Sequence, residues 1–450
     1  MEKTFMSTSE AARILGITPQ RVTQLIAQGT LEAARVGRTW IVSPESVERR
    51  IRHSSSKGGR PKRGEGRSQR RFMLMNRTHE VAELVYDIDR RSFTHVGDIV
   101  DDQRTPLGVL RGRRSTWAAS IDAWWRGRGM PGTRANLAGI LAEAGVDVPE
   151  ELVMRNLGLS LSDQYWIRPN SSGLCWEDIN FFNNPFEEVS ATTMAFSPVT
   201  PPAKAHPDNT SDGNLAKRWV VDEGVPTLIK EGGRLDQEPY NELVATRLHQ
   251  RLLPPDEFVP YHLVGSGAHA TSACPCFLSD GEEYVPALYV DRVIPDRPDL
   301  NSYQHFVACC ESLGVGEVEP SLAKMIVCDD ILANADRHWR NFGIVRDVES
   351  LVCRMAPVFD TGSSLWCDAS LEELAKGEFS FTGKQFEQSP ARQLLLVEDM
   401  SWFEASDLDG FVDEAIGILE KNPLIQDRLP YVRRSLQRRV NRIVDIREWG

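Results

Sequence analysis

The sequence predicts an α+β protein in which a small helical head precedes a larger body of two lobes. Three observations favour this class. Thr8 to Ile26 has the pattern of two short helices, residues 217–290 read as short strands around one helix, and residues 302–448 turn helical. Stretches rich in Ser, Gly and Arg at 54–71 and in Pro at 198–207 separate these parts, as linkers do.

The composition is that of an ordinary soluble protein, with 450 residues, 41% hydrophobic and 26% charged. No apolar run reaches the ~18 residues of a membrane-spanning helix, and the polar start is no signal peptide. The eight cysteines form no Cys-x-x-Cys pair, which favours reduced core residues over a metal site. We therefore expect a cytoplasmic protein with no membrane partner.

The net charge of −12 hides an asymmetry. Residues 1–71 contain 15 Lys and Arg against 6 Asp and Glu, a net charge of +9, so the rest of the chain carries −21. A basic head on an acidic body predicts that nucleic acid, if bound, is bound at the N-terminus.

The head reads as two capped helices followed by a tight hairpin around Gly37-Arg38. This pattern resembles the winged helix-turn-helix of the excisionase and MerR families. The resemblance implies that the second helix faces the DNA major groove and that the wing touches phosphate. The groove-facing residues would be Gln20, Arg21, Thr23 and Gln24, and the wing residues Arg35 and Arg38. The alternative is a small helical domain that binds another protein.

The linker that follows contains Gly59-Arg60-Pro61-Lys62, which resembles the centre of an AT-hook. In that interpretation Arg60 lies in a narrow A·T minor groove. The alternative is a basic tether without a defined site.

Residues 72–200 carry no chemistry of their own in the sequence, and we expect an adaptor or cap against the rest of the body. The pattern predicts helices at Phe72–Asp89, Thr116–Arg126 and Arg134–Ala144. The many aromatic residues between 157 and 186 alternate with aliphatic residues and small turns, which favours core packing over base stacking.

Two polar motifs lie at the open ends of a predicted hairpin near residues 342–359. Asp336 precedes Asn341 by five residues, and Asp360 follows the hairpin. This is the spacing of a catalytic loop in which one Asp takes a hydroxyl proton while Asn and a second Asp hold a metal ion. His338 lies in the same loop, where we expect it to orient the backbone. Asp330 is a candidate partner for Arg337.

An upstream strand–turn–strand would form the roof of a nucleotide site, with Lys230 at its end reaching the phosphates. Glu242 lies on the following helix, where it could pair with Lys230. Ser211, Gly213 and Asn214 belong to the polar turn before the strands and are candidate nucleotide contacts. Further strands at 259–264, 273–278 and 284–290 are expected to complete one antiparallel sheet.

Two other enzyme classes are disfavoured. The P-loop pattern Gly-x-x-x-x-Gly-Lys-Ser/Thr does not occur. Asp360-Thr361-Gly362 matches an aspartic-protease loop, but that chemistry needs two such carboxylates and the chain holds no second copy.

The stretch from Asn334 to Gly343, followed by Ala356 to Asp360, resembles the catalytic core of HipA-type serine/threonine kinases, which are bacterial toxin kinases. The resemblance implies a bilobal protein-kinase-like fold that uses ATP and Mg²⁺. Asp336 would be the base, with Asn341 and Asp360 as metal ligands. The phosphate loop of the family is not recognisable, and Asp212-Gly213-Asn214 stands in its place.

We therefore expect a winged helix-turn-helix domain at 1–52, a basic flexible linker at 53–71, the adaptor at 72–200, a kinase N-lobe at 201–290 and a C-lobe at 291–450. The expected partners are a protein with a Ser or Thr acceptor, DNA, and an antitoxin, in a regulator of the toxin–antitoxin or phage-defence type. One alternative is a DNA-binding transcriptional regulator whose degenerate kinase fold senses nucleotide. Another is a lipid or small-molecule kinase.

Overall fold

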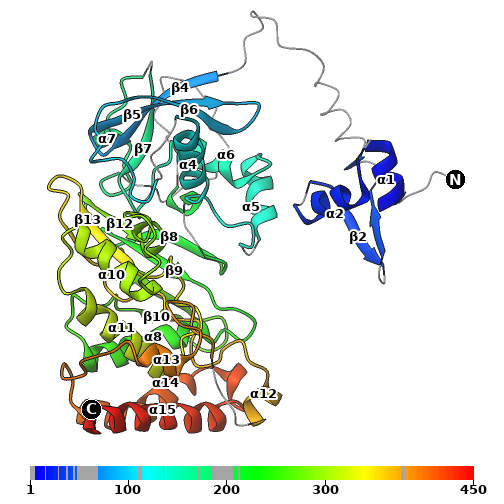
Figure 1. Ribbon diagram of the computed structural model, residues 1–450. Coiled ribbons are helices and arrows are strands. Elements are labelled where there is room, and N and C mark those ends of the chain that lie inside the picture. Colours follow the sequence, from blue (N-terminus) through cyan, green and yellow to red (C-terminus); the bar gives the residue numbers. More distant parts are fainter. Residues whose placement is uncertain are drawn as a thin grey trace, which may run out of the picture. The chain divides into compact units, whose positions relative to one another are not determined.

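The computed structural model (Figure 1) describes residues 6–15, 17–28, 30–36, 39–43, 46–47, 69–109, 114–134, 136–170, 172–184, 186, 206–210, 213–376 and 381–449. The chain divides into two units, residues 1–67 and 68–450. The first unit is the predicted head, and the second contains the adaptor region together with both predicted lobes.

The head contains the two predicted helices, α1 (Thr8–Leu15) and α2 (Pro19–Ala27). Ser7 caps α1, because its hydroxyl accepts the Glu10 N–H at 3.2 Å while the Glu10 carboxylate accepts the Ser7 N–H at 2.9 Å. The strands β1 (Met6–Ser7), β2 (Ala33–Val36) and β3 (Thr39–Val42) form a sheet in the order β1-β3-β2. The antiparallel pairing of β2 with β3 confirms the predicted hairpin, although its tip at 37–38 lies outside the described residues.

The adaptor region begins with an antiparallel sheet, so the helix predicted at Phe72–Asp89 is wrong. That stretch forms β4 (Gln69–Asn76) and β5 (His79–Asp87), and the sheet order is β6-β5-β4-β7 with β6 (Ser92–Ile99) and β7 (Tyr165–Pro169). The error has a physical reason, since β4 is buried on both faces. Phe72 and Leu74 belong to one core cluster, and Met75 belongs to another. A strand covered on both faces loses the alternation that identifies strands.

Helices cover this sheet, with α4 (Arg114–Arg126) packed on β6 and followed by α5 (Leu137–Ala144) and α6 (Pro149–Arg155). The short α7 (Trp176–Ile179) closes the region. Trp166, Trp176 and Phe186 are almost fully buried, which confirms that these aromatic residues pack in the core.

The roof strands are confirmed as β8 (Lys217–Asp222) and β9 (Val225–Lys230), which follow the 3₁₀ turn η1 (Pro207–Thr210). They join β10 (His262–Val264) and β11 (Thr271–Pro275) in an antiparallel sheet of order β10-β11-β9-β8. Helix α8 (Glu238–Leu252) contacts this sheet through β10 and β11.

The strand predicted at 284–290 does not complete that sheet. Residues Glu282–Pro286 form β12, which pairs with the hairpin of β13 (Gly343–Asp347) and β14 (Cys353–Met355) in a separate sheet. Residues Ala287–Val290 form a helical turn, α9. The hairpin itself is as predicted, and it places the chain before β13 and the chain after β14 at the same end of the sheet.

The second lobe is mostly helical (Figure 1, yellow-green to red). Its helices are α10 (Ser302–Ser312), α11 (Val318–Leu332), α12 (Leu371–Lys376), α13 (Pro390–Leu394), α14 (Phe411–Leu419) and α15 (Leu429–Trp449), with short 3₁₀ turns at Ala405–Leu408 and Pro423–Ile425. Helix α11 packs against α15, and α14 packs against α8, so one core joins this lobe to the upstream helix.

Among the described residues, no helix combines the length and apolarity that crossing a membrane requires. All eight cysteines are unpaired; five are buried as predicted, whereas Cys175 is exposed.

Candidate active site

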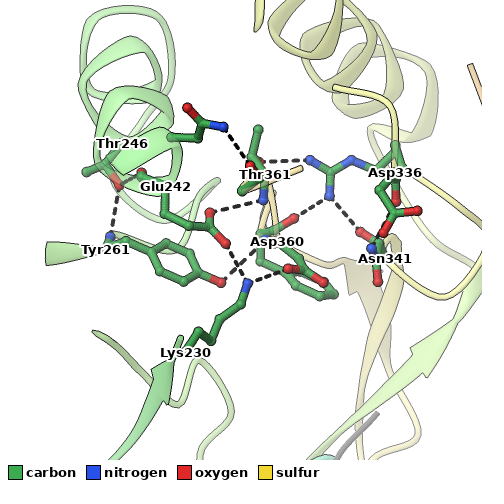
Figure 2. Close-up of polar contacts among 12 residues, drawn as sticks. Lys230, Glu242, Thr246, Tyr261, Asp336, Asn341, Asp360 and Thr361 are labelled. Atoms are coloured by element: carbon green, nitrogen blue, oxygen red, sulfur yellow. Dashed lines mark hydrogen bonds and ion pairs between the residues drawn. The ribbon is translucent and has the colours of Figure 1, made fainter. Parts of the chain in front are cut away.

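Lys230, at the end of β9, lies between two carboxylates that come from distant parts of the chain (Figure 2). Its Nζ is 2.5 Å from Glu242 Oε1 on α8, and it also donates to Asp360 Oδ1, beyond β14. Lys230 and Glu242 are buried, and Asp360 is partly exposed. The pairing of a strand lysine with a helix glutamate was predicted from the sequence, whereas the direct contact of the lysine with Asp360 was not.

The Lys230 ammonium and the Asp360 carboxylate stabilise each other's charged forms. Burial disfavours the ammonium, but the carboxylates of Asp360 and Glu242 outweigh it and raise the pKa of Lys230 above its usual value. Burial also acts against the Asp360 carboxylate, yet the nearby ammonium holds the pKa of Asp360 well below its usual range. The pKa of Glu242 is raised, mainly by burial. Lys230 therefore stays cationic and Asp360 anionic near neutral pH.

Arg337 is the structural centre of the loop that carries Asp336 and Asn341, and the sequence did not reveal that role. It is fully buried and forms a bidentate pair with Asp329, with Nε 2.9 Å from Oδ2 and Nη2 3.0 Å from Oδ1. It also donates to the backbone carbonyls of Asn341, at 2.9 Å, and Phe359. One guanidinium thus joins the segment before β13 to the segment after β14.

The predicted pairing of Asp330 with Arg337 is wrong, because the two acids at the end of α11 point to different partners. Asp330 is buried and forms ion pairs with Arg439 and Arg442 of α15. Successive residues of a helix project about 100° apart, so only one of the two neighbours can face the loop.

Asp360 has a left-handed backbone with φ of 57°. Asp tolerates this conformation better than most residues, but it still has to be held. Three contacts hold it (Figure 2). The Asp360 N–H donates to the Tyr261 hydroxyl at 3.3 Å, the preceding carbonyl of Phe359 accepts from Arg337, and the Thr361 N–H donates to Glu242 Oε2 at 3.0 Å.

Asp336 and Asn341 lie together in the loop after α11. The Asn341 amide nitrogen donates to the Asp336 carbonyl at 3.0 Å, and the Asp336 N–H donates to the Asn334 side chain at 3.1 Å. His338 Nδ1 accepts the Arg340 N–H at 3.2 Å, and its carbonyl accepts the Asn341 N–H at 2.7 Å. These bonds of His338 are those of a residue that orients the loop.

A cavity of about 460 Å³ brings the predicted groups together. Its lining includes Lys230, Asp336, His338, Asn341, Asp360, Gly213 and Asn214. Glu242 is not part of the lining and lies behind Lys230 and Asp360. A third wall comes from the adaptor region, through residues that the sequence did not single out: Leu107, Trp124, Arg128, Ser162, Asp163 and Tyr165.

The polar turn before β8 contacts the adaptor region as well as the cavity. Asn214 Oδ1 accepts the Thr133 hydroxyl at 2.5 Å, and the Leu215 carbonyl accepts Arg134 at 2.7 Å. Gly213 has φ of 98°, a conformation that favours glycine. Ser211, the remaining predicted contact of this turn, lies outside the described residues.

The side chains of the cavity suit a magnesium ion better than a metal ion that is bound by protein groups alone. No group of three or more His, Cys, Asp or Glu side chains suited to a metal occurs in the described part of the chain. Mg²⁺ needs fewer, since it commonly binds one or two carboxylates together with substrate phosphates and water. Asp360 offers a carboxylate. The bond of Asn341 to Asp336 uses its amide nitrogen and leaves the amide oxygen for a metal.

In the head, α2 exposes Gln20, Arg21, Thr23 and Gln24, whereas Val22 and Leu25 on its other side are buried. The helix therefore presents one polar face, as predicted for a recognition helix. Arg35 lies on β2, and its side chain is not described; Arg38 and Arg60 lie outside the described residues.

Comparison with known proteins identifies the head directly, because a helix-turn-helix domain model matches residues 5–55. This match confirms the predicted helix-turn-helix domain. No curated protein matches the sequence of this chain.

The solved structures that resemble the chain include two with TM-scores below 0.5. One is the proinflammatory kinase CtkA of Helicobacter pylori, with 17% identity and a TM-score of 0.39 over 52% of this chain and 94% of that chain. The other belongs to the toxin–antitoxin complex of HipA, HipB and operator DNA from Shewanella oneidensis MR-1, with 13% identity and a TM-score of 0.45 over 84% of this chain and 100% of that chain. The case for function therefore comes from the residues of this chain.

Proposed function

We propose that this chain is an ATP- and Mg²⁺-dependent kinase that phosphorylates Ser or Thr hydroxyls of a protein and that binds DNA through its head. The observation that carries the proposal is the position of Lys230. It pairs with a buried glutamate and with Asp360, in the cavity that also holds Asp336 and Asn341. A lysine, a glutamate, a base and two metal-binding groups are the parts that phosphoryl transfer requires.

The reaction assigned to these residues is a direct displacement. The acceptor hydroxyl oxygen forms a bond to the γ-phosphorus of ATP, the bond to the β,γ-bridging oxygen breaks, and ADP leaves with the electron pair. The hydroxyl proton passes to the Asp336 carboxylate. Held by Asn341 and Asp360, Mg²⁺ would supply positive charge against the phosphate oxygens.

The other residues of the site position these groups. Lys230 offers its ammonium to the phosphates, and Glu242 holds that ammonium at the cavity wall. Arg337 fixes the backbone of Asn341 and of Phe359 next to Asp360, so the two metal-binding side chains keep one relative position. Preorganised groups of this kind need no rearrangement during the reaction.

DNA binding by the head is supported by the helix-turn-helix match and by the exposed polar face of α2. The positive charge of residues 1–71 favours attraction to phosphate. A kinase attached to such a domain would act as a regulator that contains its own enzyme. The protein HipB and operator DNA in the similar HipA structure make an antitoxin a reasonable partner to test for this chain.

The test is transfer of labelled γ-phosphate from ATP with Mg²⁺ to proteins of a cell lysate, by the intact chain and by Asp336→Ala. We expect transfer to Ser or Thr with the intact chain and its loss with Asp336→Ala. Absence of transfer by the intact chain, with ATP still bound, would favour a nucleotide-sensing regulator. Label found in lipid or small molecules instead of protein would favour a lipid or small-molecule kinase.

A further inference from the structure

A lysine from a distant segment contacts the proposed catalytic base. Lys384 Nζ lies 2.6 Å from Asp336 Oδ1, across 48 residues of sequence. Lys384 is half exposed and Asp336 is about one-third exposed, so the pair stands at the open side of the loop. No motif in the sequence pointed to this lysine.

The segment that carries Lys384 is firmly attached to the catalytic loop. The next residue, Gln385, is buried and donates to Asp329 Oδ2 at 2.9 Å, the carboxylate that also holds Arg337. The Gln385 carbonyl accepts the Trp339 indole N–H at 2.8 Å. Phe386 packs edge-on against Trp339, with ring centroids 5.4 Å apart. Exposed ion pairs usually contribute little, but here the backbone on one side of the pair is fixed against the other.

We infer that Lys384 is a catalytic residue: its ammonium orients the Asp336 carboxylate and neutralises the phosphoryl group as it transfers. This inference rests on the proposed kinase function. During the displacement the acceptor oxygen must lie within hydrogen-bonding reach of Asp336 and in line with the γ-phosphorus. The oxygens of the transferring group therefore lie one acceptor atom away from the carboxylate that Lys384 contacts, within reach of a flexible lysine side chain.

Lys230 and Lys384 then have different roles. Lys230 lies deep between Glu242 and Asp360 and serves the phosphates of the bound nucleotide. Lys384 lies on the acceptor side, beside the base. Its loss should therefore lower the rate of the chemical step and leave nucleotide binding largely unchanged.

The experiment compares steady-state phosphate transfer by Lys384→Met, Lys384→Arg and the matched control Lys376→Met. Lys376 is also an exposed lysine in an ion pair, with Glu372 at 3.0 Å on α12. We expect Lys384→Met to lower kcat by about 10²-fold with little change in the KM for ATP, the order of effect seen when one electrostatic group is removed from an active site. Lys384→Arg should keep a substantial part of the activity, and Lys376→Met all of it.

A chemical rescue separates charge from shape. Lys384→Cys treated with 2-bromoethylamine regains an ammonium through a thioether of nearly the same length as lysine, whereas iodoacetamide adds a neutral group. The wild-type chain treated with each reagent controls for the exposed Cys175. We expect recovery with the amine alone. Full activity of Lys384→Met, equal recovery with both reagents, or a change confined to the KM for ATP would overturn the inference while leaving the kinase proposal in place. A wild-type chain that transfers no phosphate would overturn both.

Discussion

Arg337 joins the two polar segments of the cavity through a side chain with no exposed surface. It holds Asp329 in a bidentate pair and binds carbonyls on both sides of the β13–β14 hairpin. Burial disfavours the guanidinium charge, yet the Asp329 carboxylate outweighs it and the pKa of Arg337 is raised. The geometry of the proposed site therefore depends on a residue to which the proposed mechanism gives no chemical step.

Arg337→Met tests this role. The substitution leaves the Asp329 carboxylate buried without its cation, and such losses destabilise proteins by about 3–5 kcal/mol. We expect a decrease of that order in the free energy of unfolding, measured with urea, together with loss of phosphate transfer. Arg354→Met is the control, because Arg354 forms a surface pair with Glu282 at 2.8 Å and such pairs contribute about 0–1 kcal/mol. Equal losses in the two variants would contradict the role given to Arg337.

Among single residues, the sequence predicted the candidate site groups better than the residues that support them. Asp336, Asn341 and Asp360 were chosen from their spacing and Lys230 from its place at the end of a strand upstream of them, and the structure brings all four to one cavity. Arg337 and Lys384 were missed as site residues because their roles depend on contacts made by the folded chain. The sequence around an arginine in a polar motif, or around a lysine in a loop, looks the same whether its side chain is exposed to solvent or contacts the site.

Helix α2 is the element on which DNA recognition is proposed to depend. Its exposed side carries Gln20, Arg21, Thr23 and Gln24, and Arg21 Nη1 donates to Gln24 Oε1 at 2.9 Å. In free protein this bond orders two neighbouring side chains on the face that would enter the major groove.

Arg21→Ala should weaken binding to the preferred duplex, selected from a random-sequence library, by about 1–3 kcal/mol, with relaxed preference at the contacted base pair. Titration of the full chain with fluorescent duplexes at fixed salt measures this. Gln28→Ala is the control, since Gln28 is exposed just beyond the end of α2. If Arg21→Ala bound like wild type, or if no duplex were enriched, α2 would not be a recognition helix.

The elements that could be predicted were those with one buried face, because their apolar residues then recur at regular intervals in the sequence. The two head helices, the strands β8 and β9 and the β13–β14 hairpin have one exposed face or a clear turn, and they lie where expected. The strand β4 is covered on both faces and was mistaken for a helix. The strand predicted at 284–290 covers only the last three residues of β12, and the partner of β12 lies 57 to 65 residues further along, because Glu282 pairs with Asp347 at one end and Pro286 with Gly343 at the other. Such pairing leaves no local signal.

For the whole molecule, the adaptor region and the two lobes form one unit, and a buried polar network crosses between them. Arg346 of β13 donates to Glu283 of β12 at 2.7 Å and to the Tyr165 hydroxyl of β7 at 2.7 Å. Asn76 of β4 donates to the other oxygen of Glu283 at 2.9 Å. Tyr165 and Asn76 of the adaptor sheet thus form hydrogen bonds with the buried Arg346–Glu283 pair of the hairpin sheet.

Tyr165→Phe should therefore destabilise the whole unit rather than the adaptor alone. A hydrogen bond to a charged group contributes about 1.5–3 kcal/mol, and we expect the unfolding free energy of residues 68–450 to fall by that amount in a single transition. Urea unfolding followed by tryptophan fluorescence and by circular dichroism measures this. Tyr431→Phe, in a half-buried tyrosine of α15, is the control. Separate transitions, with only one shifted, would show that the adaptor folds independently of the lobes.

The cavity is also a property of the whole molecule. Its chemistry comes from the lobes, but one wall belongs to the adaptor region, and the adaptor residues Thr133 and Arg134 bond the turn at Asn214 and Leu215. The sequence predicted an adaptor or cap at residues 72–200 and singled out none of its residues for the site. Its part in the cavity could not be predicted, because it follows from tertiary contacts across more than 80 residues.

In the proposed reaction, Asp336 supports transfer of the γ-phosphoryl group of ATP to a protein hydroxyl. Mass spectrometry of products formed with ATP carrying heavy oxygen throughout its γ-phosphate tests it most directly, with the intact chain and Asp336→Ala. We predict phosphoserine or phosphothreonine that carries three heavy oxygens, the fourth coming from the acceptor hydroxyl, and none with Asp336→Ala. Labelled inorganic phosphate without a labelled protein, or equal labelling by both chains, would contradict the account.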